Sequence, residues 1–408
     1  LLLVAGGVWW FALRDTEPSH EPGPFNVHAW VPPWNIENAL ADLEPRANMF
    51  HQISPFWYEV TGVSSIQPYA NTPAEETDEF VAKARTRGIP LVGSLYDRTA
   101  PEVMAALLAD PESRAAHIDA IVDFAADNDF QGIDINYENF AFNDGRDTWA
   151  TTRPVWVTFI EELSARLHAD GRLLTVSVPP VYDDGQTEDS GYWVYDYASI
   201  APHVDAIRVM AYDYSVADPG PIAPLPWVEE LIAGSTEAAG SPDKLVLGIP
   251  LYGRNWVIAT SGECPEGTPG RQEPRLNAIE DLIERRDAEP IYNEDTGEWS
   301  FTYQVAFPED DPVCTQTREV HYLDADGAQQ RMQMSVDNGW LGVSLFAFSY
   351  EDDAVWDSIA EINATLETVP GDSVAPTTDA ATTAAPTTAA PTTVAPTTTA
   401  ATTTTTTA

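Results

Sequence analysis

The sequence predicts an α/β fold, a (β/α)8 TIM barrel with a small α+β insertion after the seventh strand. Short apolar runs rich in β-branched residues recur along the chain, and stretches with apolar residues at helical spacing separate several of them. A doubly wound open sheet is the alternative, but no glycine-rich phosphate loop follows the first run. The predicted strands are residues 25–31, 49–55, 90–95, 131–137, 173–178, 206–211, 245–250 and 342–348.

Helices are predicted between these strands because start and stop residues frame the periodic stretches. The clearest helix opens with Thr72 as its N-cap and Pro73 at the first helical position, and it ends at Gly88. The other helices are expected at residues 112–127, 156–169, 227–232, 325–338 and 351–366. Strands that are each followed by a helix are typical of a barrel.

The gap after the seventh strand, residues 252–323, is too long for a single helix. It contains a helical stretch at 277–286 and two aromatic-rich strands at 299–305 and 318–323. We therefore expect a small α+β insertion on a barrel loop. Because the loops that follow barrel strands carry the chemistry, such an insertion is expected to wall a substrate cleft.

The small number of cysteines and the spacing of the histidines argue against a fold built around many disulfides or around a metal ion. Cys264 and Cys314 are the only cysteines and both lie in the insertion. We expect them to form a disulfide in an oxidising compartment, and two free buried thiols are the alternative. The seven histidines show no metal-ligand spacing, so no metal or other cofactor is expected.

The two ends of the chain differ in composition from the predicted barrel, which spans residues 25–369. Residues 1–24 hold an uncharged apolar run and a Pro-rich linker, which are interpreted as a signal or membrane-anchor remnant. Residues 370–408 are almost entirely Ala, Pro and Thr, typical of a disordered spacer; an inert tail is the alternative. Both ends predict an extracellular or cell-surface protein, either secreted or tethered to membrane or wall.

The charge of the chain limits its partners. With 20 Lys and Arg against 64 Asp and Glu, the net charge is -44. A surface this negative repels nucleic-acid phosphates and anionic lipids, so neither is expected as a partner. We expect a monomer.

The fourth predicted strand carries the chemistry. Because side chains alternate along a strand, Asp134, Asn136 and Glu138 share one face, the barrel interior. Burying two acids and an amide there costs free energy, which indicates that these side chains have a function. Glu138 comes last, at the C-terminal rim where barrel enzymes act, and a carboxyl in that position is suited to general acid catalysis. A structural hydrogen-bond network is the alternative.

Residues 131–138 read Q-G-I-D-I-N-Y-E, which resembles the D-x-x-D-x-D-x-E motif of glycoside hydrolase family 18, the chitinase-type barrels. Three other strands agree with the resemblance: 209–214 is similar to the family's Met-x-Tyr-Asp motif, and 247–254 and 342–347 resemble its seventh and eighth strands. The similarity covers residues 25–366. It is closest to the bacterial branch that includes spore-cortex and cell-wall hydrolases.

The resemblance implies a retaining, substrate-assisted mechanism in which the N-acetyl oxygen of the sugar is the nucleophile. Glu138 would be the general acid and base, supported by Asp134 and Asn136, while Tyr212 would orient the acetamide and Asp213 would contact the sugar. The residues expected to bind substrate are Met210, Phe346, Tyr252, Trp256 and Trp57. The implied partner is a polysaccharide, chitin or peptidoglycan.

Three positions depart from the family pattern. Gln131 replaces the outermost Asp of the motif, and Phe346 stands where a Trp usually lies under the sugar. Asn136 replaces the Asp nearest Glu138, which removes a negative charge from the developing oxazolinium. Two hypotheses follow: a glycosidase weakened by Asn136, or a lectin-like barrel that binds carbohydrate without turnover. The sequence does not separate chitin from peptidoglycan, or endo from exo cleavage.

Overall fold

A ring of eight parallel strands forms the centre of the computed structural model, which describes residues 20–181, 191–308, 310 and 312–368. The hydrogen-bonded order is β2-β1-β14-β9-β8-β7-β6-β5, and a bridge between Ile53 and Leu91 joins its two ends. The predicted barrel is therefore confirmed. Its strands are β1 (Asn26–Val31), β2 (Gln52–Pro55), β5 (Val92–Asp97), β6 (Gly132–Asn136), β7 (Leu173–Val178), β8 (Ala206–Val209), β9 (Leu245–Pro250) and β14 (Gly342–Phe346).

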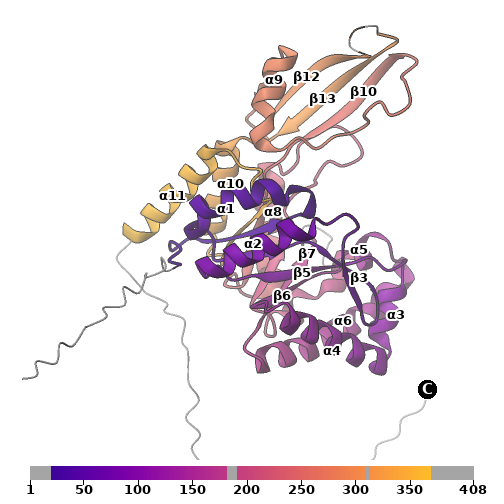
Figure 1. The fold of residues 1–408 in the computed structure, drawn as a ribbon, viewed down its shortest axis with the longest axis vertical. Helices are drawn as coiled ribbons and strands as arrows, with labels where there is room; N and C mark the ends of the chain where they lie inside the picture. Colours follow the sequence, from indigo (N-terminus) through magenta and orange to yellow (C-terminus); the bar gives the residue numbers. More distant parts are fainter. Residues whose placement is uncertain (1–19, 182–190, 309, 311, 369–408) are drawn as a thin grey trace, which may run out of the picture. The chain divides into compact units, whose positions relative to one another are not determined.

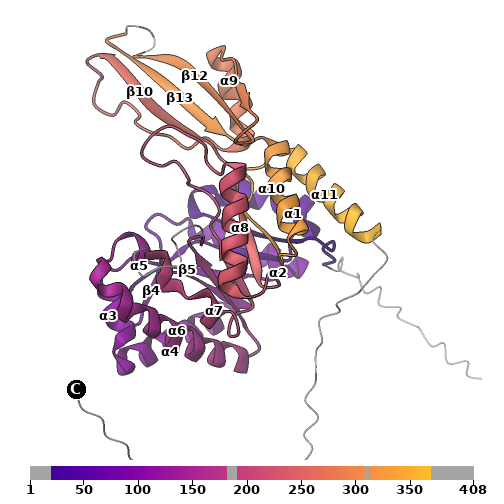
Figure 2. The same ribbon diagram turned by 180° about the vertical axis from the view of Figure 1, so that it is seen from behind.

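The helices lie around the outside of these strands, as the two opposite views in Figures 1 and 2 show. The helices around the barrel are α1 (Ile36–Arg46), α2 (Ala74–Arg87), α3 (Val103–Ala109), α4 (Pro111–Asp127), α5 (Asn139–Phe142), α6 (Arg146–Ala169), α7 (Tyr197–Ile200), α8 (Leu225–Ala239), α10 (Ala325–Asp337) and α11 (Asp353–Thr368), whereas α9 (Ile279–Arg286) lies in the insertion. Short 3-10 helices lie at Pro33–Asn35, Ala47–Met49, Gly191–Tyr195 and Leu276–Ala278.

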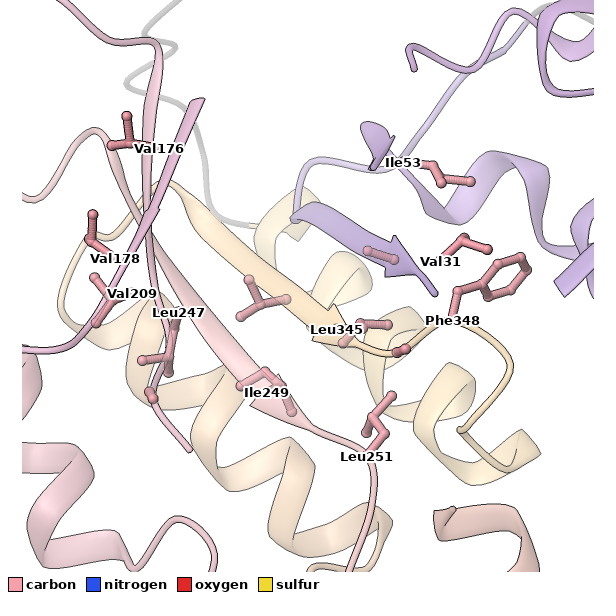
Figure 3. Close-up of a cluster of buried hydrophobic side chains, with 14 of the residues drawn as sticks. Val31, Ile53, Val176, Val178, Val209, Leu247, Ile249, Leu251, Leu345 and Phe348 are labelled. Atoms are coloured by element: carbon pink, nitrogen blue, oxygen red, sulfur yellow. The ribbon is translucent and has the colours of Figure 1, made fainter. Parts of the chain in front are cut away.

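The strands present apolar side chains to the helices and polar side chains to the barrel interior. On β6, for example, Ile133 and Ile135 are buried in the outer core, while Asp134 and Asn136 point inward. Figure 3 shows apolar side chains of the outer core on β1, β2, β7, β8, β9 and β14. The buried inward residues are mostly polar: His28, Gln52, Ser54, Ser94, Asp134, Asn136, Thr175, Ser177, Arg208 and Ser344. The interior of the barrel is thus built for a polar network.

The ends of several elements differ from the prediction. Thr72 was expected to cap the helix that ends at Gly88, which is wrong: α2 begins at Ala74 after Pro73, without a side-chain cap. Gly88 does end this helix, in the left-handed conformation at φ 74°, where its N–H reaches the carbonyls of Ala84 and Arg85. Strand β8 stops at Val209 rather than at residue 211, because the chain turns there into the loop that carries the site.

Two features of the first part of the chain had no clear sequence pattern. Helix α1 contains Pro45 in its last turn, which obscured the helical pattern. A hairpin of β3 (Tyr58–Gly62) and β4 (Ser65–Pro68) extends the sheet beyond β5. Its outer strand is largely exposed, so the strand lacks the apolar alternation that predicts a buried one.

The insertion between β9 and α10 is a four-stranded antiparallel sheet with α9, in the order β10-β13-β12-β11. Its strands are β10 (Arg254–Gly262), β11 (Ile291–Asn293), β12 (Glu298–Phe307) and β13 (Cys314–Tyr322). The disulfide between Cys264 and Cys314 is confirmed and ties the loop after β10 to the start of β13. The insertion was predicted, but β10 and β11 were not.

The apolar run at the start of the chain and the Thr-rich tail lie outside the described residues. Among the helices that the structure describes, none has the length and apolar character needed to cross a bilayer.

Candidate active site

Strand β6 delivers the predicted acid to the C-terminal rim of the barrel. Asp134 and Asn136 are buried inside the barrel, and Glu138 follows the strand at the start of α5, where it is half-buried. Between them, Tyr137 is buried on the opposite side, and its hydroxyl lies 2.7 Å from Nε2 of His117 on α4. This anchor outside the barrel holds the end of β6, so that Asn136 and Glu138 face the interior.

Asp134 is the centre of the interior network. Its Oδ2 accepts hydrogen bonds from Ser94 Oγ (2.8 Å) and Trp30 Nε1 (3.2 Å), and it forms an ion pair with Arg208 at 3.1 Å. Its Oδ1 accepts a hydrogen bond from Ser177 Oγ at 2.7 Å. Since Asp134 and Arg208 are both 0% exposed, the charge of each is compensated within the barrel. Asp134 therefore connects β1, β5, β7 and β8 through hydrogen bonds beneath the cleft.

Glu138 is the predicted acid of this site. Burial raises its pKa, the hydrogen bond with Asn136 lowers it and the charge of Asp213 raises it, and the resulting pKa is about 7. At neutral pH this carboxyl is therefore present in both protonation states, as a group that alternately donates and accepts a proton requires. Asn136 is 5% exposed, and its Oδ1 is buried without a hydrogen-bond partner.

The loop after β8 brings Tyr212 and Asp213 to the same place. Asp213 has a left-handed backbone at φ 66° and forms an ion pair with Arg254 at 2.6 Å. The hydroxyl of Tyr252 donates a hydrogen bond to Oδ1 of Asp213. The ring of Tyr212 lies 5.7 Å from that of Phe346 and 6.3 Å from that of Tyr252, measured between centroids. Burial raises the pKa of Tyr212 well above its usual range, so its hydroxyl remains a donor.

These groups open into a cleft of about 810 Å³. Four of the five residues predicted to be catalytic line it (Asn136, Glu138, Tyr212 and Asp213), and so do three of those predicted to bind substrate (Met210, Tyr252 and Phe346). The remaining lining residues are Trp30, Trp34, Phe56, Tyr96, Phe142, Pro179, Pro180, Tyr192, Tyr214, Val216, Trp227, Arg254, Glu273, Arg275 and Tyr350. Exposed aromatic side chains on the rim, such as Trp34 and Phe142, are suited to stack on sugar rings.

The structure places two of the predicted substrate-binding residues away from the cleft lining. Trp57 is 1% exposed and packs edge-on against Phe80 in the outer core, with ring centroids 5.8 Å apart. Trp256 on β10 is 4% exposed, and its Nε1 donates to the carbonyl of Val216 at 3.1 Å. Trp256 thus fixes a loop that lines the cleft, while Trp57 is a core residue.

Several residues of the site were not singled out from the sequence. Arg254, Glu273 and Arg275 come from the base of the insertion, and Tyr350 follows β14. Arg254 Nε lies 3.6 Å from Glu273, and the guanidinium of Arg275 lies 5.1 Å from the ring centre of Tyr350. Arg254 belongs to the recognised seventh-strand motif, so its place in that motif was the available indication. Glu273, Arg275 and Tyr350 belong to no motif.

Residues 20–181, 191–308 and 312–368 contain no group of His, Cys, Asp or Glu side chains arranged to hold a metal ion. At the cleft, Arg254 forms ion pairs with Asp213 and Glu273.

Comparisons with known proteins agree with this geometry. The model of glycosyl hydrolases family 18 matches residues 72–351. The putative sporulation-specific glycosylase YdhD of Bacillus subtilis is 29% identical over 237 residues, which cover 57% of this chain and 50% of that protein. The chain thus spans about half the length of YdhD. A probable endochitinase of Caenorhabditis elegans is 29% identical over 185 residues, 40% of this chain and 28% of that protein.

Solved structures show the same fold. A chitinase from Chromobacterium violaceum superposes with a TM-score of 0.68 at 24% identity, covering 83% of this chain and 98% of that one. The spore cortex-lytic enzyme SleL of Bacillus cereus gives a TM-score of 0.68 at 17% identity, covering 83% of this chain and 74% of that one.

Proposed function

Because the chain belongs to glycosyl hydrolases family 18, we propose that it hydrolyses β-1,4-linked N-acetylglucosamine polymers with Glu138 as general acid and base. The observation that carries this proposal is the position of Glu138, a carboxyl with a pKa of about 7 on the floor of a cleft that also holds Tyr212 and Asp213. A carboxyl with an ordinary pKa would be almost fully ionised at neutral pH and would lack the proton to donate.

In the proposed first step, the carboxyl of Glu138 donates its proton to the glycosidic oxygen, and the bond from that oxygen to C1 breaks. The acetamide oxygen of the same sugar closes on C1 and forms an oxazolinium ion. Holding the nucleophile within the substrate replaces a bimolecular encounter with an intramolecular one. In the second step water attacks C1, Glu138 accepts the proton of the water, and the ring opens with retained configuration.

Two neighbouring groups are placed to orient the acetamide. The hydroxyl of Tyr212 would donate a hydrogen bond to its carbonyl oxygen, and the unpartnered Oδ1 of Asn136 would accept one from its N–H. A buried acceptor without a partner costs free energy, and a substrate N–H would relieve that cost. Asn136 supplies no negative charge, so we expect slow turnover compared with a site that has Asp at this position.

The aromatic lining of the cleft supports a sugar ligand. Phe346 lies beside Tyr212 and Trp30, with ring centroids 5.7 and 5.9 Å away. This group presents apolar ring faces next to the acid, which is the surface that a pyranose ring stacks on.

The test compares the wild type with Glu138→Gln on chitin oligosaccharides and on purified peptidoglycan, with products sized by mass. Gln keeps the shape of the side chain but has no proton to donate, so we expect products from the wild type and none from the variant. Equal sugar binding by both proteins, with turnover by neither, would instead establish a lectin-like barrel. The relatives YdhD and SleL are named for sporulation and spore cortex, so peptidoglycan belongs in the assay beside chitin.

We also propose that the protein acts outside the cell or at its surface. The disulfide between Cys264 and Cys314 supports this, because such bonds persist in oxidising compartments. Fractionation of the source cells, with the protein detected by antibody, tests the proposal. Recovery with the cytosolic fraction would contradict it.

A further inference from the structure

A buried glutamate of the insertion contacts the loop that carries Asp213. This loop runs from residue 210 to 224, between β8 and α8, and we call it the cleft loop. Glu298 begins β12 and is 2% exposed; its Oε2 accepts a hydrogen bond from the N–H of Ile222 at 2.8 Å, and its Oε1 accepts one from the N–H of Ala223 at 2.7 Å. Hydrogen bonds from backbone N–H groups to a carboxylate are roughly twice as strong as neutral ones. Both oxygens of Glu298 therefore hold the backbone of the cleft loop.

Arg331 on α10 reinforces this contact. Its Nε and Nη2 donate to the carbonyl of Ala223 at 3.0 and 2.7 Å, and its Nη2 lies 3.7 Å from Oε1 of Glu298. Both side chains are buried, and buried charges are costly unless they are paired and hydrogen-bonded. Ala223 is thus held through its N–H by Glu298 and through its carbonyl by Arg331.

The backbone before β12 also lies against the end of the cleft loop. The N–H of Leu225, the first residue of α8, donates to the carbonyl of Thr296 at 3.0 Å. Gly297 has φ 66°, and a Cβ at this position would lie 2.5 Å from Cδ1 of Leu225. A side chain would not fit there, so the close approach that brings Glu298 to the loop depends on a glycine.

The hold of Glu298 reaches the neighbour of Asp213 through one residue. The carbonyl of Ile222, whose N–H is bound by Glu298, accepts a hydrogen bond from the N–H of Tyr214 at 2.9 Å. Asp213 directly precedes Tyr214 and has a left-handed backbone at φ 66°. A non-glycine residue keeps this conformation only where the surrounding contacts fix it. The bonds of Ile222 are part of what fixes it here.

We propose that Glu298 is a positioning residue: by holding Ile222 and Ala223, it fixes the cleft loop and thereby places Asp213 in the cleft. Glu298 itself lies outside the cleft lining, so it acts on a ligand only through the loop. The effect on turnover rests on the proposed glycosidase function, whereas the hold on the loop concerns the protein alone. The insertion then determines the position of a residue of the site as well as walling the cleft.

Glu298→Gln tests the hold on the loop without any substrate. Gln keeps the shape of the side chain but replaces one acceptor oxygen by an amide group, so one N–H of the cleft loop loses its partner. The measurement is amide hydrogen exchange, resolved to single amides. Tyr214 is the informative amide because it does not bond to Glu298 directly. Losing a hydrogen bond to a charged group corresponds to about a tenfold or larger increase in local opening, so exchange at Tyr214 should accelerate by about that factor. Unchanged exchange at Tyr214 overturns the proposal.

Trp299→Phe is the matched control on the same strand. The Nε1 of Trp299 donates to Oδ2 of Asp324, the N-cap of α10, at 2.7 Å. This variant removes a hydrogen bond of the insertion and leaves the contacts of Glu298 to the cleft loop in place. Exchange at Tyr214 should therefore equal that of the wild type. An equal acceleration in both variants would mean that general loosening of the insertion releases the loop, and the role of Glu298 would be rejected.

Turnover tests whether the hold matters at the site. A displacement of about 1 Å can cost on the order of a hundredfold in rate, so Glu298→Gln should lower kcat/KM by roughly tenfold to a hundredfold. In the Asp213→Ala background the same change should have little further effect, because the residue to be positioned is already absent. Losses that multiply, or an unchanged kcat/KM in Glu298→Gln alone, contradict the positioning role. An inactive wild type with accelerated exchange at Tyr214 in Glu298→Gln would reject the glycosidase and retain the hold on the loop.

Glu298→Asp replaces the Gln variant if that variant does not fold. Asp keeps a carboxylate beside Arg331, but its side chain is one methylene shorter and draws away from the N–H groups of Ile222 and Ala223. Exchange at Tyr214 should again accelerate relative to Trp299→Phe. Wild-type exchange in a folded Asp variant counts against the proposal.

Discussion

Replacing Asn136 by Asp should accelerate the proposed reaction, because it places a negative charge beside the developing oxazolinium. The Asn136 side chain is 5% exposed and its Oδ1 has no partner, so a carboxylate there would act with little screening by water. A full charge at about 4 Å from a cationic centre is worth about 4 kcal/mol at an effective dielectric constant near 20.

Repulsion between the new carboxylate and Asp134 opposes this gain. Side chains two positions apart on a strand are separated by about 6.6 Å, which corresponds to about 2.5 kcal/mol between like charges. Arg208, 3.1 Å from Asp134, cancels part of that repulsion. The net stabilisation of the transition state is therefore about 2–4 kcal/mol, or roughly 30- to 1000-fold in kcat.

The assay is the initial rate of product formation from a chitin oligosaccharide, with kcat and KM determined separately. Asn136→Leu is the matched control, since it has similar volume, removes the acceptor and should lower kcat. The unfolding temperature of each variant checks that the fold is kept. A folded Asn136→Asp protein with unchanged or lower kcat would refute the assignment of position 136 as the source of slow turnover.

Three further predictions concern the acid, the core and the insertion. The proposed mechanism requires the protonated form of Glu138, whose pKa is raised to about 7. We therefore expect kcat/KM to be constant at lower pH and to fall about tenfold per pH unit above 7. A decline that begins near pH 5 would contradict this. Trp57→Ala should lower the free energy of unfolding by about 3–5 kcal/mol and leave KM unchanged, because Trp57 is a core residue. A raised KM at normal stability in denaturant titrations would restore Trp57 to the substrate site. Changing Cys264 and Cys314 together to Ser should lower the free energy of unfolding by about 4 kcal/mol, on the chain-entropy estimate for a loop of 50 residues. Equal urea midpoints for the variant and the oxidised wild type would show that the disulfide does not stabilise the fold.

The barrel and the position of the acid were predictable because both depend on short-range patterns. Period-two alternation on β6 separates Asp134 and Asn136 from Ile133 and Ile135 without any tertiary information. Helix ends were predictable where a residue type is required by the backbone, as at Gly88, and failed at Thr72, where the helix begins after Pro73 without a side-chain cap.

The pattern of a strand does not reveal what a rim aromatic contacts. Trp57 and Tyr252 both follow strand ends and were equally plausible substrate residues, yet Trp57 packs against Phe80 and Tyr252 reaches Asp213. The difference arises because Phe80 on α2 covers Trp57, whereas Tyr252 lies beside the loop after β8 that carries Asp213.

The sequence by itself determined the order of the eight barrel strands, the strand that carries Glu138 and the absence of a carboxylate at position 136. Only the tertiary structure decided how the charges there are balanced. Arg208 lies 74 residues beyond Asp134, and Arg254 reaches Asp213 from the insertion. Such pairs form because barrel closure brings distant strands to one axis, whereas alternation along a strand specifies only the face on which each side chain lies.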